Sequence, residues 1–180
     1  MKHLYILLSR LFFSIVYCPR YLHGKWFDGN VYGWKMCWKF FWLQKIRGFN
    51  RHVPFPVCPF SSFGKAENIT FALDNIDNFW KNGVYFQSWN GHITIGEGTW
   101  IAPGVGLITE NHDPKNLEKH LDSKDIVIGK NCWIGMNSVI LPGVVLGDST
   151  IVGAGAVVTK SFPQGNVTLA GVPAKEIRRN

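Results

Sequence analysis

The polar stretch over residues 110–125, ENHDPKNLEKHLDSKD, contains the side chains best suited to proton transfer in this chain. His112 lies there between Glu110 and Asp113. An imidazole gains and loses a proton near neutral pH, so it can accept a proton from a hydroxyl, and a nearby carboxylate or carbonyl can fix its second ring nitrogen. The residue types alone leave two interpretations open, a general base or a solvated loop histidine.

This polar stretch interrupts a repeat. From Ile128 onward an aliphatic side chain returns at every sixth residue, and the residue after it is mostly glycine. A period of six fits a short strand that points alternate side chains inward, followed by a corner that glycine, asparagine or serine can turn. Three such sides close a coil of about 18 residues, and stacked coils form a parallel β-helix. The aliphatic series is Ile128, Ile134, Ile140, Leu146, Val152 and Val158, and we expect Asn131, Asn137 and Ser149 at corners.

The same phase reappears upstream, at Ile95, Ile101 and Leu107. Leu107 and Ile128 are separated by 21 residues, three more than three hexads, and the residues between them have no aliphatic period. We therefore expect an inserted loop at about residues 110–125, a place where binding and catalytic residues are often found. Residues 67–94 are expected to form a first, irregular coil.

The motifs in this half of the chain resemble the hexapeptide-repeat acyltransferases, in the branch of galactoside, maltose and capsule O-acetyltransferases. The similarity covers about residues 84–180 and rests on five motifs: ITIGEGTWIAPGV, ITENHD, CWIGMNSVILPGV, IVGAGAVVTKSFP and AGVPAKEIR. It implies a mainly β fold, a left-handed parallel β-helix of hexapeptide repeats, and a homotrimer. It also implies acetyl-CoA in a groove between neighbouring subunits and a loop histidine as general base.

The resemblance assigns roles to individual positions. His112 matches the general base, with Glu110 and Asp113 as candidates to orient its ring. Ser88 stands where relatives carry an asparagine that binds the acceptor, and Asn90 is the alternative acceptor contact. Lys175 and Arg178 are cations suited to the nucleotide phosphates. The full set matched to the cofactor is Trp133, Ala154, Thr159, Lys160, Lys175 and Arg178.

The function implied is acetyl-CoA-dependent O-acetylation of a hydroxyl on a bacterial surface saccharide (capsule, O-antigen or exopolysaccharide) or on its lipid-linked precursor. Two alternatives stay open, N-acetylation of an amino sugar and a non-catalytic trimeric β-helix that serves as a scaffold. The sequence has no zinc pattern, so we expect no metal cofactor. We expect His92 to be structural and His120 to be solvated.

Residues 1–66 form a basic, aromatic segment, and we expect residues 67–180 to form the β-helix domain. The first 66 residues hold ten Lys or Arg, one acid and 17 of the 26 aromatic residues. Their pattern predicts helices over residues 4–17 and 34–42, with the tryptophans of the second helix on one face. The prolines of VPFPVCPF predict an extended linker over residues 53–60. A short basic C-terminal helix is expected to cover the last coil.

A basic segment rich in tryptophan is typical of a surface that binds an anionic membrane, and packing on the β-helix or on a neighbouring subunit is the alternative. Nucleic acid is not expected, because no binding-module signature is present. The apolar runs are too short to span a bilayer, and Arg10 splits the run that resembles a signal peptide. The four cysteines indicate reduced thiols. We therefore expect a cytoplasmic protein with a peripheral membrane contact through residues 1–50.

Overall fold

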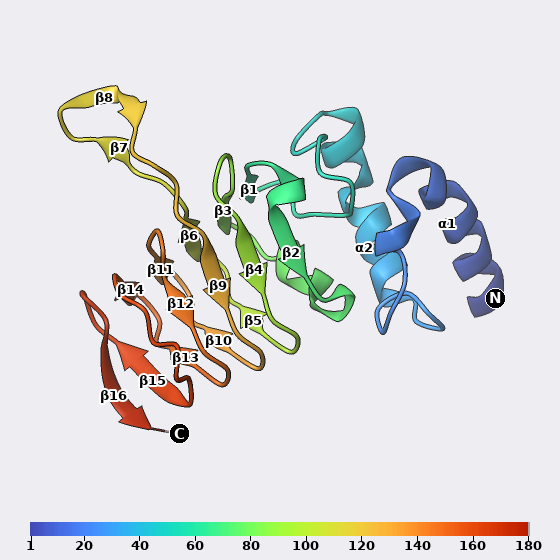
Figure 1. Cartoon of the computed structure of the whole chain (residues 1–180). Helices are drawn as coiled ribbons and strands as arrows, with labels where there is room; N and C mark the ends of the chain where they lie inside the picture. Colours follow the sequence, from blue (N-terminus) through green and yellow to red (C-terminus); the bar gives the residue numbers. More distant parts are fainter. Residues whose placement is uncertain (180) are drawn as a thin grey trace.

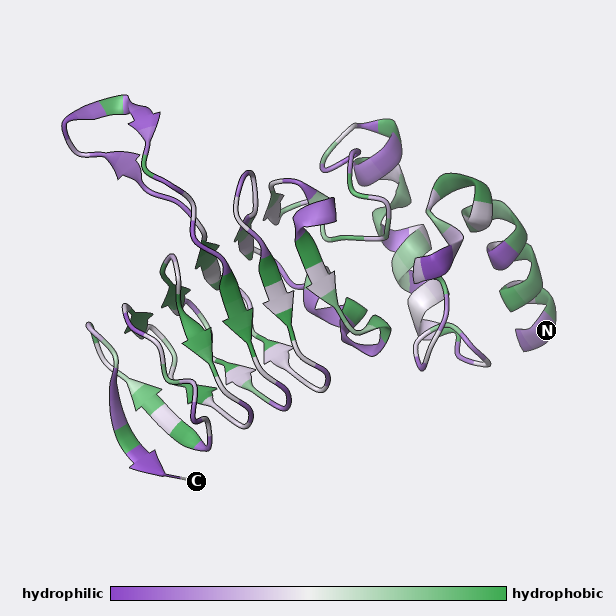
Figure 2. Ribbon diagram, viewed as in Figure 1, coloured by the Kyte–Doolittle hydropathy of each residue, from purple (hydrophilic) through white to green (hydrophobic). Residues whose placement is uncertain are grey.

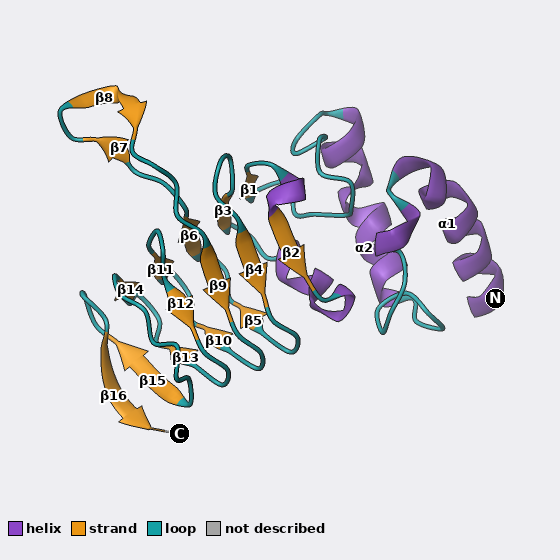
Figure 3. Cartoon of the chain, in the orientation of Figure 1, coloured by secondary structure: helices purple, strands orange, loops and turns teal. Residues whose placement is uncertain are grey.

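The computed structural model describes residues 1–179 and shows an elongated molecule with its two termini at opposite ends (Figure 1). The helices gather at the N-terminal end, and strands build the rest of the molecule (Figure 3). One buried apolar core includes Phe13, in helix α1 (Lys2–Val16), and Leu169, in strand β15 (Val167–Ala170). Within residues 1–179, no helix combines the length and the apolar character that crossing a bilayer requires.

Three parallel sheets form the three sides of a β-helix. Each strand hydrogen-bonds to the equivalent strand of the next coil, so that Ile134 lies opposite Val152, 18 residues later, as the repeat predicts. Side A contains β1 (Ser62–Phe63), β3 (Tyr85–Gln87), β6 (Gly106–Ile108), β11 (Val139–Ile140) and β14 (Val157–Val158); side B contains β2 (Ile69–Phe71), β4 (Ile93–Ile95), β9 (Ile126–Ile128) and β12 (Val145–Leu146); side C contains β5 (Trp100–Ile101), β10 (Trp133–Ile134), β13 (Ile151–Val152) and β15, to which β16 (Lys175–Arg179) is added.

Residues with a positive φ turn the corners at the predicted spacing. Asn131, Asn137 and Ser149 have φ angles between 53° and 57°, and Gly143 and Gly155 adopt the same left-handed region at 82° and 68°. Glycine has no Cβ to clash there, and asparagine enters this region more readily than most residues. The six-residue period of the sequence is therefore also the period of the corners.

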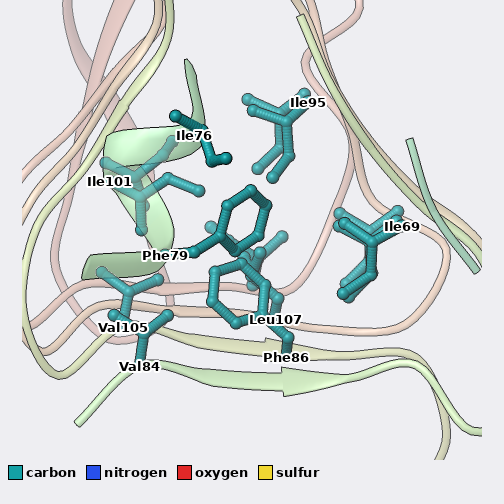
Figure 4. Close-up of a cluster of buried hydrophobic side chains, with 14 of the residues drawn as sticks. Ile69, Ile76, Phe79, Val84, Phe86, Ile95, Ile101, Val105 and Leu107 are labelled. Carbon is teal, nitrogen blue, oxygen red and sulfur yellow. The ribbon is translucent and has the colours of Figure 1, made fainter. Parts of the chain in front are cut away.

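The aliphatic series fills the interior of the β-helix. All six members from Ile128 to Val158 are buried, and Ile95, Ile101 and Leu107 point into a shared core near the first coils (Figure 4). The glycine that follows most of them lies against the backbone of the next coil. A Cβ on Gly135 would sit 2.6 Å from the carbonyl oxygen of Val152. The repeat therefore reflects both inward packing and close contact between coils.

The first coil is irregular, as expected. β1 and β2 form its sides A and B, η3 (Ala66–Asn68) lies between them, and a 3₁₀ segment, η4 (Leu73–Trp80), replaces the strand on side C. The side chain of Asn78 takes over the missing strand contacts, because its Nδ2 donates to Thr99 O at 2.8 Å and its Oδ1 accepts from Ile101 N at 2.9 Å. Parallel pairing begins at Ser62, upstream of the boundary predicted after residue 66.

The proline-rich stretch over residues 53–60 has no helix, as predicted, but it is part of the core and not a linker between separate parts. Val53, Phe55 and Val57 are fully buried. The side-chain amide of Gln44 donates to Phe55 O at 2.9 Å, and its Oε1 accepts from Val57 N at 3.2 Å. This stretch therefore joins the N-terminal helices and the β-helix into one core.

The N-terminal segment is helical, as predicted, although the tryptophans of its second helix differ in burial. Helix α1 is followed by η1 (Pro19–Tyr21), and α2 (Tyr32–Phe41) continues into a π-helical turn, η2 (Trp42–Ile46). Trp34 is fully buried, whereas Trp38 and Trp42 are exposed. Trp38 packs on α1, with its Nε1 donating to Ser9 Oγ at 3.0 Å. The two helices therefore support each other.

The predicted C-terminal helix is wrong, because these residues form strand β16. It pairs antiparallel with β15, with Thr168 opposite Arg178 and Ala170 opposite Lys175. A helix of a single turn or so has a high nucleation cost. Strand β15, in contrast, presents an open edge of backbone N–H and C=O groups that a neighbouring strand satisfies at once.

Candidate active site

The insertion between β6 and β9 folds as a β-hairpin that projects from the coils (Figure 1). Its strands are β7 (His112–Asp113) and β8 (Asn116–His120), and His112 lies opposite His120. Asp113 Oδ1 accepts from Lys115 N at 2.8 Å, which stabilises the turn between the two strands. The hairpin is predominantly hydrophilic (Figure 2). The loop predicted at about residues 110–125 is therefore a polar arm with a fixed cross-strand register.

A backbone carbonyl holds the ring of His112. Its Nδ1 lies 2.7 Å from Leu117 O. A carbonyl oxygen only accepts hydrogen bonds, so Nδ1 carries a hydrogen, and in the neutral form of the ring Nε2 has the free lone pair. The residue is exposed to solvent. A fixed ring with an accessible basic nitrogen is what general-base chemistry requires.

Glu110 and His120 lie beside His112. The centroids of the two imidazole rings are 4.3 Å apart, in an edge-to-face arrangement. His120 Nδ1 is 3.7 Å from Oε1 of Glu110, whose side chain is only 3% exposed. A buried carboxylate needs donors or a cation, and Asn90 Nδ2 supplies a donor at 2.8 Å. His120 is exposed, as expected, with 45% of its side chain accessible, and it lies between the buried carboxylate and His112.

Gln87 fixes the base of the arm. Its Oε1 accepts from the backbone N–H groups of Thr109 and Glu110 at 2.8 and 2.9 Å, and its Nε2 donates to Glu110 O at 3.1 Å. Ser88 is fully buried, and its hydroxyl donates to Lys65 O at 3.0 Å. Of the two acceptor contacts predicted, Asn90 is the one at the surface.

These groups lie along one edge of the β-helix, where side A turns into side B. The coils contribute residues 88–92, 109–125, 141–144 and 159–161 to this edge. A hollow of about 400 Å³ lies beside the base of the arm, and leucine and proline side chains form its apolar part. Its lining consists of Asn111, Leu121, Asp122, Lys124, Leu141, Pro142 and Thr159.

The residues matched to the cofactor divide between two parts of the surface. Thr159 and Lys160 are exposed at the same edge as His112. Trp133 projects from side C, next to Trp100 of the preceding coil, and Ala154 lies at the corner where side C turns into side A. The remaining two, Lys175 and Arg178, are exposed on β16. Within a single chain, Thr159 and Lys160 therefore share an edge with His112, whereas the other residues matched to the cofactor lie on side C, at its corner or on β16.

Metal ligands do not cluster in the part of the chain that the structure describes. No group of three or more His, Cys, Asp or Glu side chains in residues 1–179 is placed to hold a metal ion. All four cysteines are free thiols. Burial raises the pKa of the Cys37 and Cys132 thiols, which keeps them protonated and unreactive.

The parts of this site that depend on the hairpin are not apparent from the sequence. Every residue has a backbone carbonyl, so nothing in the sequence singles out Leu117. His120 could have been found, because Asp-Pro at residues 113–114 is a turn signal. A tight turn there places the two histidines on opposite strands. Gln87 belongs to no motif.

Comparison with known proteins supports the family suggested by the motifs. Residues 125–160 match the family described as bacterial transferase hexapeptide (six repeats). Galactoside O-acetyltransferase of Escherichia coli K12 is 46% identical over 91 residues, which are 48% of this chain and 43% of that protein. WbbJ of the same organism, named for O-acetyl transfer in lipopolysaccharide biosynthesis, is 38% identical over 131 residues, 66% of this chain and 63% of that protein.

The fold is also shared with a solved structure. A galactoside acetyltransferase in complex with coenzyme A has 35% identity and a TM-score of 0.57, over 68% of this chain and 60% of that chain. This chain spans less than two thirds of the length of each of these three proteins. The shared fold is the left-handed parallel β-helix. In its six-residue repeat, its hairpin histidine and these matches, the chain is similar to the hexapeptide-repeat acetyltransferases.

Proposed function

We propose that this protein is an O-acetyltransferase that uses acetyl-CoA to acetylate a hydroxyl of a bacterial surface saccharide or of its lipid-linked precursor. The observation that carries the proposal is the hydrogen bond between His112 Nδ1 and Leu117 O, at 2.7 Å. It leaves Nε2 as an accessible base at an edge that also has an apolar hollow. A sugar hydroxyl is a weak nucleophile at neutral pH and needs such a base.

The chemistry follows from the position of that nitrogen. His112 Nε2 accepts the proton of the acceptor hydroxyl while the oxygen attacks the thioester carbonyl. The C–O bond forms, the C–S bond breaks, and the imidazolium returns the proton to the departing sulfur. The imidazolium is stabilised by the Leu117 carbonyl, which accepts from Nδ1, and by the negative charge of Glu110, which reaches it through His120.

The residues at the edge fit an acetyl-CoA donor. The hollow beside the arm is partly apolar, which suits the pantetheine chain, and Thr159 lines it. Lys160 is an exposed cation on the same edge, and Lys175 and Arg178 are exposed on β16. These cations suit the phosphates of a nucleotide. The galactoside acetyltransferase structure holds coenzyme A, which supports the same donor here.

We further propose that the complete site lies between two copies in a homotrimer. His112, Thr159 and Lys160 share the edge between sides A and B, whereas Trp133 and Ala154 lie on side C and at its corner. If one donor molecule contacts both sets, they must come from different copies. Light scattering that gave a monomer mass for a fully active preparation would contradict this assembly.

The saccharide acceptor is proposed from two observations. Asn90 is exposed beside the buried Glu110 and can pair with hydroxyl groups. The relatives named for galactoside and lipopolysaccharide acetylation act on sugars by name. A lipid-linked acceptor would place the enzyme at the inner face of the cytoplasmic membrane, and the four free cysteines suit the reducing cytoplasm.

The test is an acetyl-transfer assay with the purified chain. Acetyl-CoA and a panel of galactosides, glucosides and amino sugars are supplied, thiol release is followed, and the product is analysed by mass spectrometry and NMR. We expect thiol release that depends on the acceptor, with an added acetyl ester. An acetamide product would favour the amino-sugar alternative. Absence of coenzyme A binding by calorimetry would favour the scaffold alternative.

A further inference from the structure

Helix α1 carries an apolar stripe that nothing else in the described part of the chain covers. Figure 2 shows α1 as a largely hydrophobic element at the N-terminal end of the molecule. The stripe residues follow helical spacing, and each is between 54% and 89% exposed. They are Leu4, Leu7, Leu8, Leu11 and Ile15. A single exposed leucine is ordinary, but a continuous stripe of five marks an interaction surface.

The opposite face of α1 holds the helix in place. Ser9 and Phe13 are buried, and Ser9 Oγ accepts the indole hydrogen bond of Trp38. Because this inner face already packs on the core, the stripe cannot turn inward. Phe12 stacks on the exposed Trp38 at 5.2 Å, so the apolar surface continues from α1 onto α2.

The charges around the stripe are positive. Asp28 is the one acid in residues 1–66, and it accepts from Arg10 at 3.0 Å. Nine other basic residues of this segment have no acid of their own segment to pair with. Lys2 and Lys35 border one shallow apolar hollow with Met1, Tyr5 and Val31. Arg10 and His3 lie along the polar flank of the helix, beside the stripe.

We propose that α1 docks on an anionic lipid bilayer, lying in its interfacial plane with the stripe inserted and the lysines at the headgroups. The combination of leucines, tryptophans and a basic flank suits that interface. A helix of 15 residues is about 22 Å long, shorter than the roughly 30 Å hydrocarbon core, so it lies along the membrane. A second copy of the chain is the less suitable occupant, because pairing two such segments brings like charges together. This surface is independent of the proposed chemistry.

The test is flotation of the full chain with vesicles. One set consists of phosphatidylcholine alone and the other contains 30 mol% phosphatidylglycerol. We expect binding to the anionic set, weakening as salt is raised. Leu7→Gln/Leu11→Gln should lower the partition coefficient at least tenfold, since it removes two inserted side chains while keeping good helix formers. Lys2→Glu/Lys35→Glu should abolish the preference for the anionic set.

The matched control is Phe60→Gln/Val172→Gln, which removes two exposed apolar side chains that lie outside α1. It should bind like the unmodified chain, and circular dichroism should show all variants folded. Equal partition of the control and the leucine variant, or equal binding to both vesicle sets, would overturn the proposal. A stripe-dependent increase in mass by light scattering without vesicle binding would also overturn it, and would identify a second copy as the occupant.

Discussion

The rings of His112 and His120 meet edge to face, 4.3 Å apart, across the two strands of the projecting hairpin. The pairing joins a ring held by a backbone carbonyl to a ring that reaches a buried carboxylate. The side chain of His120 therefore lies between the ring of His112 and the charge of Glu110. The first two predictions separate the roles of these two histidines.

His112→Ala should lower kcat by about 10²–10⁴, because the base is lost, while binding of coenzyme A stays close to normal. Folding should survive, since the side chain is exposed and lies outside the coils. Steady-state kinetics with calorimetry provide the measurement. His23→Ala, an exposed histidine in the N-terminal segment, is the control and should keep full turnover. Full turnover in His112→Ala would require a different base.

His120→Ala should lower kcat about fivefold with little change in KM, because an interaction worth ~1 kcal/mol with the imidazolium is lost. In the His112→Ala background the same change should have almost no effect, since the ring that it supports is absent. Equal effects in both backgrounds would mean that His120 only stabilises the hairpin. His120→Gln should restore part of the rate, because its amide is a polar donor that can approach Glu110 in place of the ring.

Lys160→Ala should weaken binding of coenzyme A by ~1–3 kcal/mol, the range for a hydrogen bond to a charged group. Isothermal calorimetry measures the change directly. Lys25→Ala removes an equally exposed cation from the N-terminal segment and should leave the affinity unchanged. If both variants bind as the unmodified chain does, Lys160 does not contact the donor.

Gly135→Ala should destabilise the fold by about 2–4 kcal/mol, because the new methyl group would lie 2.6 Å from a backbone oxygen of the next coil. Gly106→Ala is the matched control. The nearest atoms to a Cβ there are 3.6 Å away, which is ordinary contact, so its unfolding free energy should change by less than about 1 kcal/mol. Urea unfolding of both variants provides the measurement. Similar unfolding midpoints for the two variants would contradict the close approach of the coils.

Lys45 gives a pH-dependent stability whose sign can be derived. Burial and the neighbouring Arg51 lower the pKa of Lys45 from 10.5 to about 8. Between these two values the unfolded chain binds the proton more tightly than the folded chain, so the free energy of unfolding rises with pH. We expect the free energy of unfolding of the unmodified chain, relative to that of Lys45→Met, to increase from pH 8 to pH 9.5. A constant difference in urea unfolding over this range would contradict the lowered pKa.

The β-helix could be predicted because its geometry repeats in the sequence. Inward side chains recur at every sixth residue, and Asn131, Asn137 and Ser149 turn the corners as expected. The C-terminal strand could not be predicted in the same way. β16 is extended because it pairs with the open edge of β15, and that edge exists only once the coils have formed. Local sequence says little about such a partner.

The candidate residues of the site come from motifs in the sequence, whereas their contacts depend on the fold. His112 is found from the motif that contains it, whereas its partner is the carbonyl of Leu117 rather than one of the two neighbouring carboxylates. Trp34 illustrates the same limit in the N-terminal segment. Its helix was predicted, but burial depends on the layer of side chains below it, so a tryptophan expected with Trp38 on one face belongs to the core.

The antiparallel strand at the C-terminal end of the coils has a consequence for how copies can associate. A parallel β-helix with a bare last coil could pair with another copy end to end and grow into filaments. β16 instead adds an outer antiparallel strand to side C, and it carries Lys175, Arg178 and Arg179 with one acid, Glu176, so that net positive charge on two such strands opposes their pairing. Helical layers cover the first coil at the other end (Figure 1). These features disfavour growth along the axis, while lateral association through the long edges stays open.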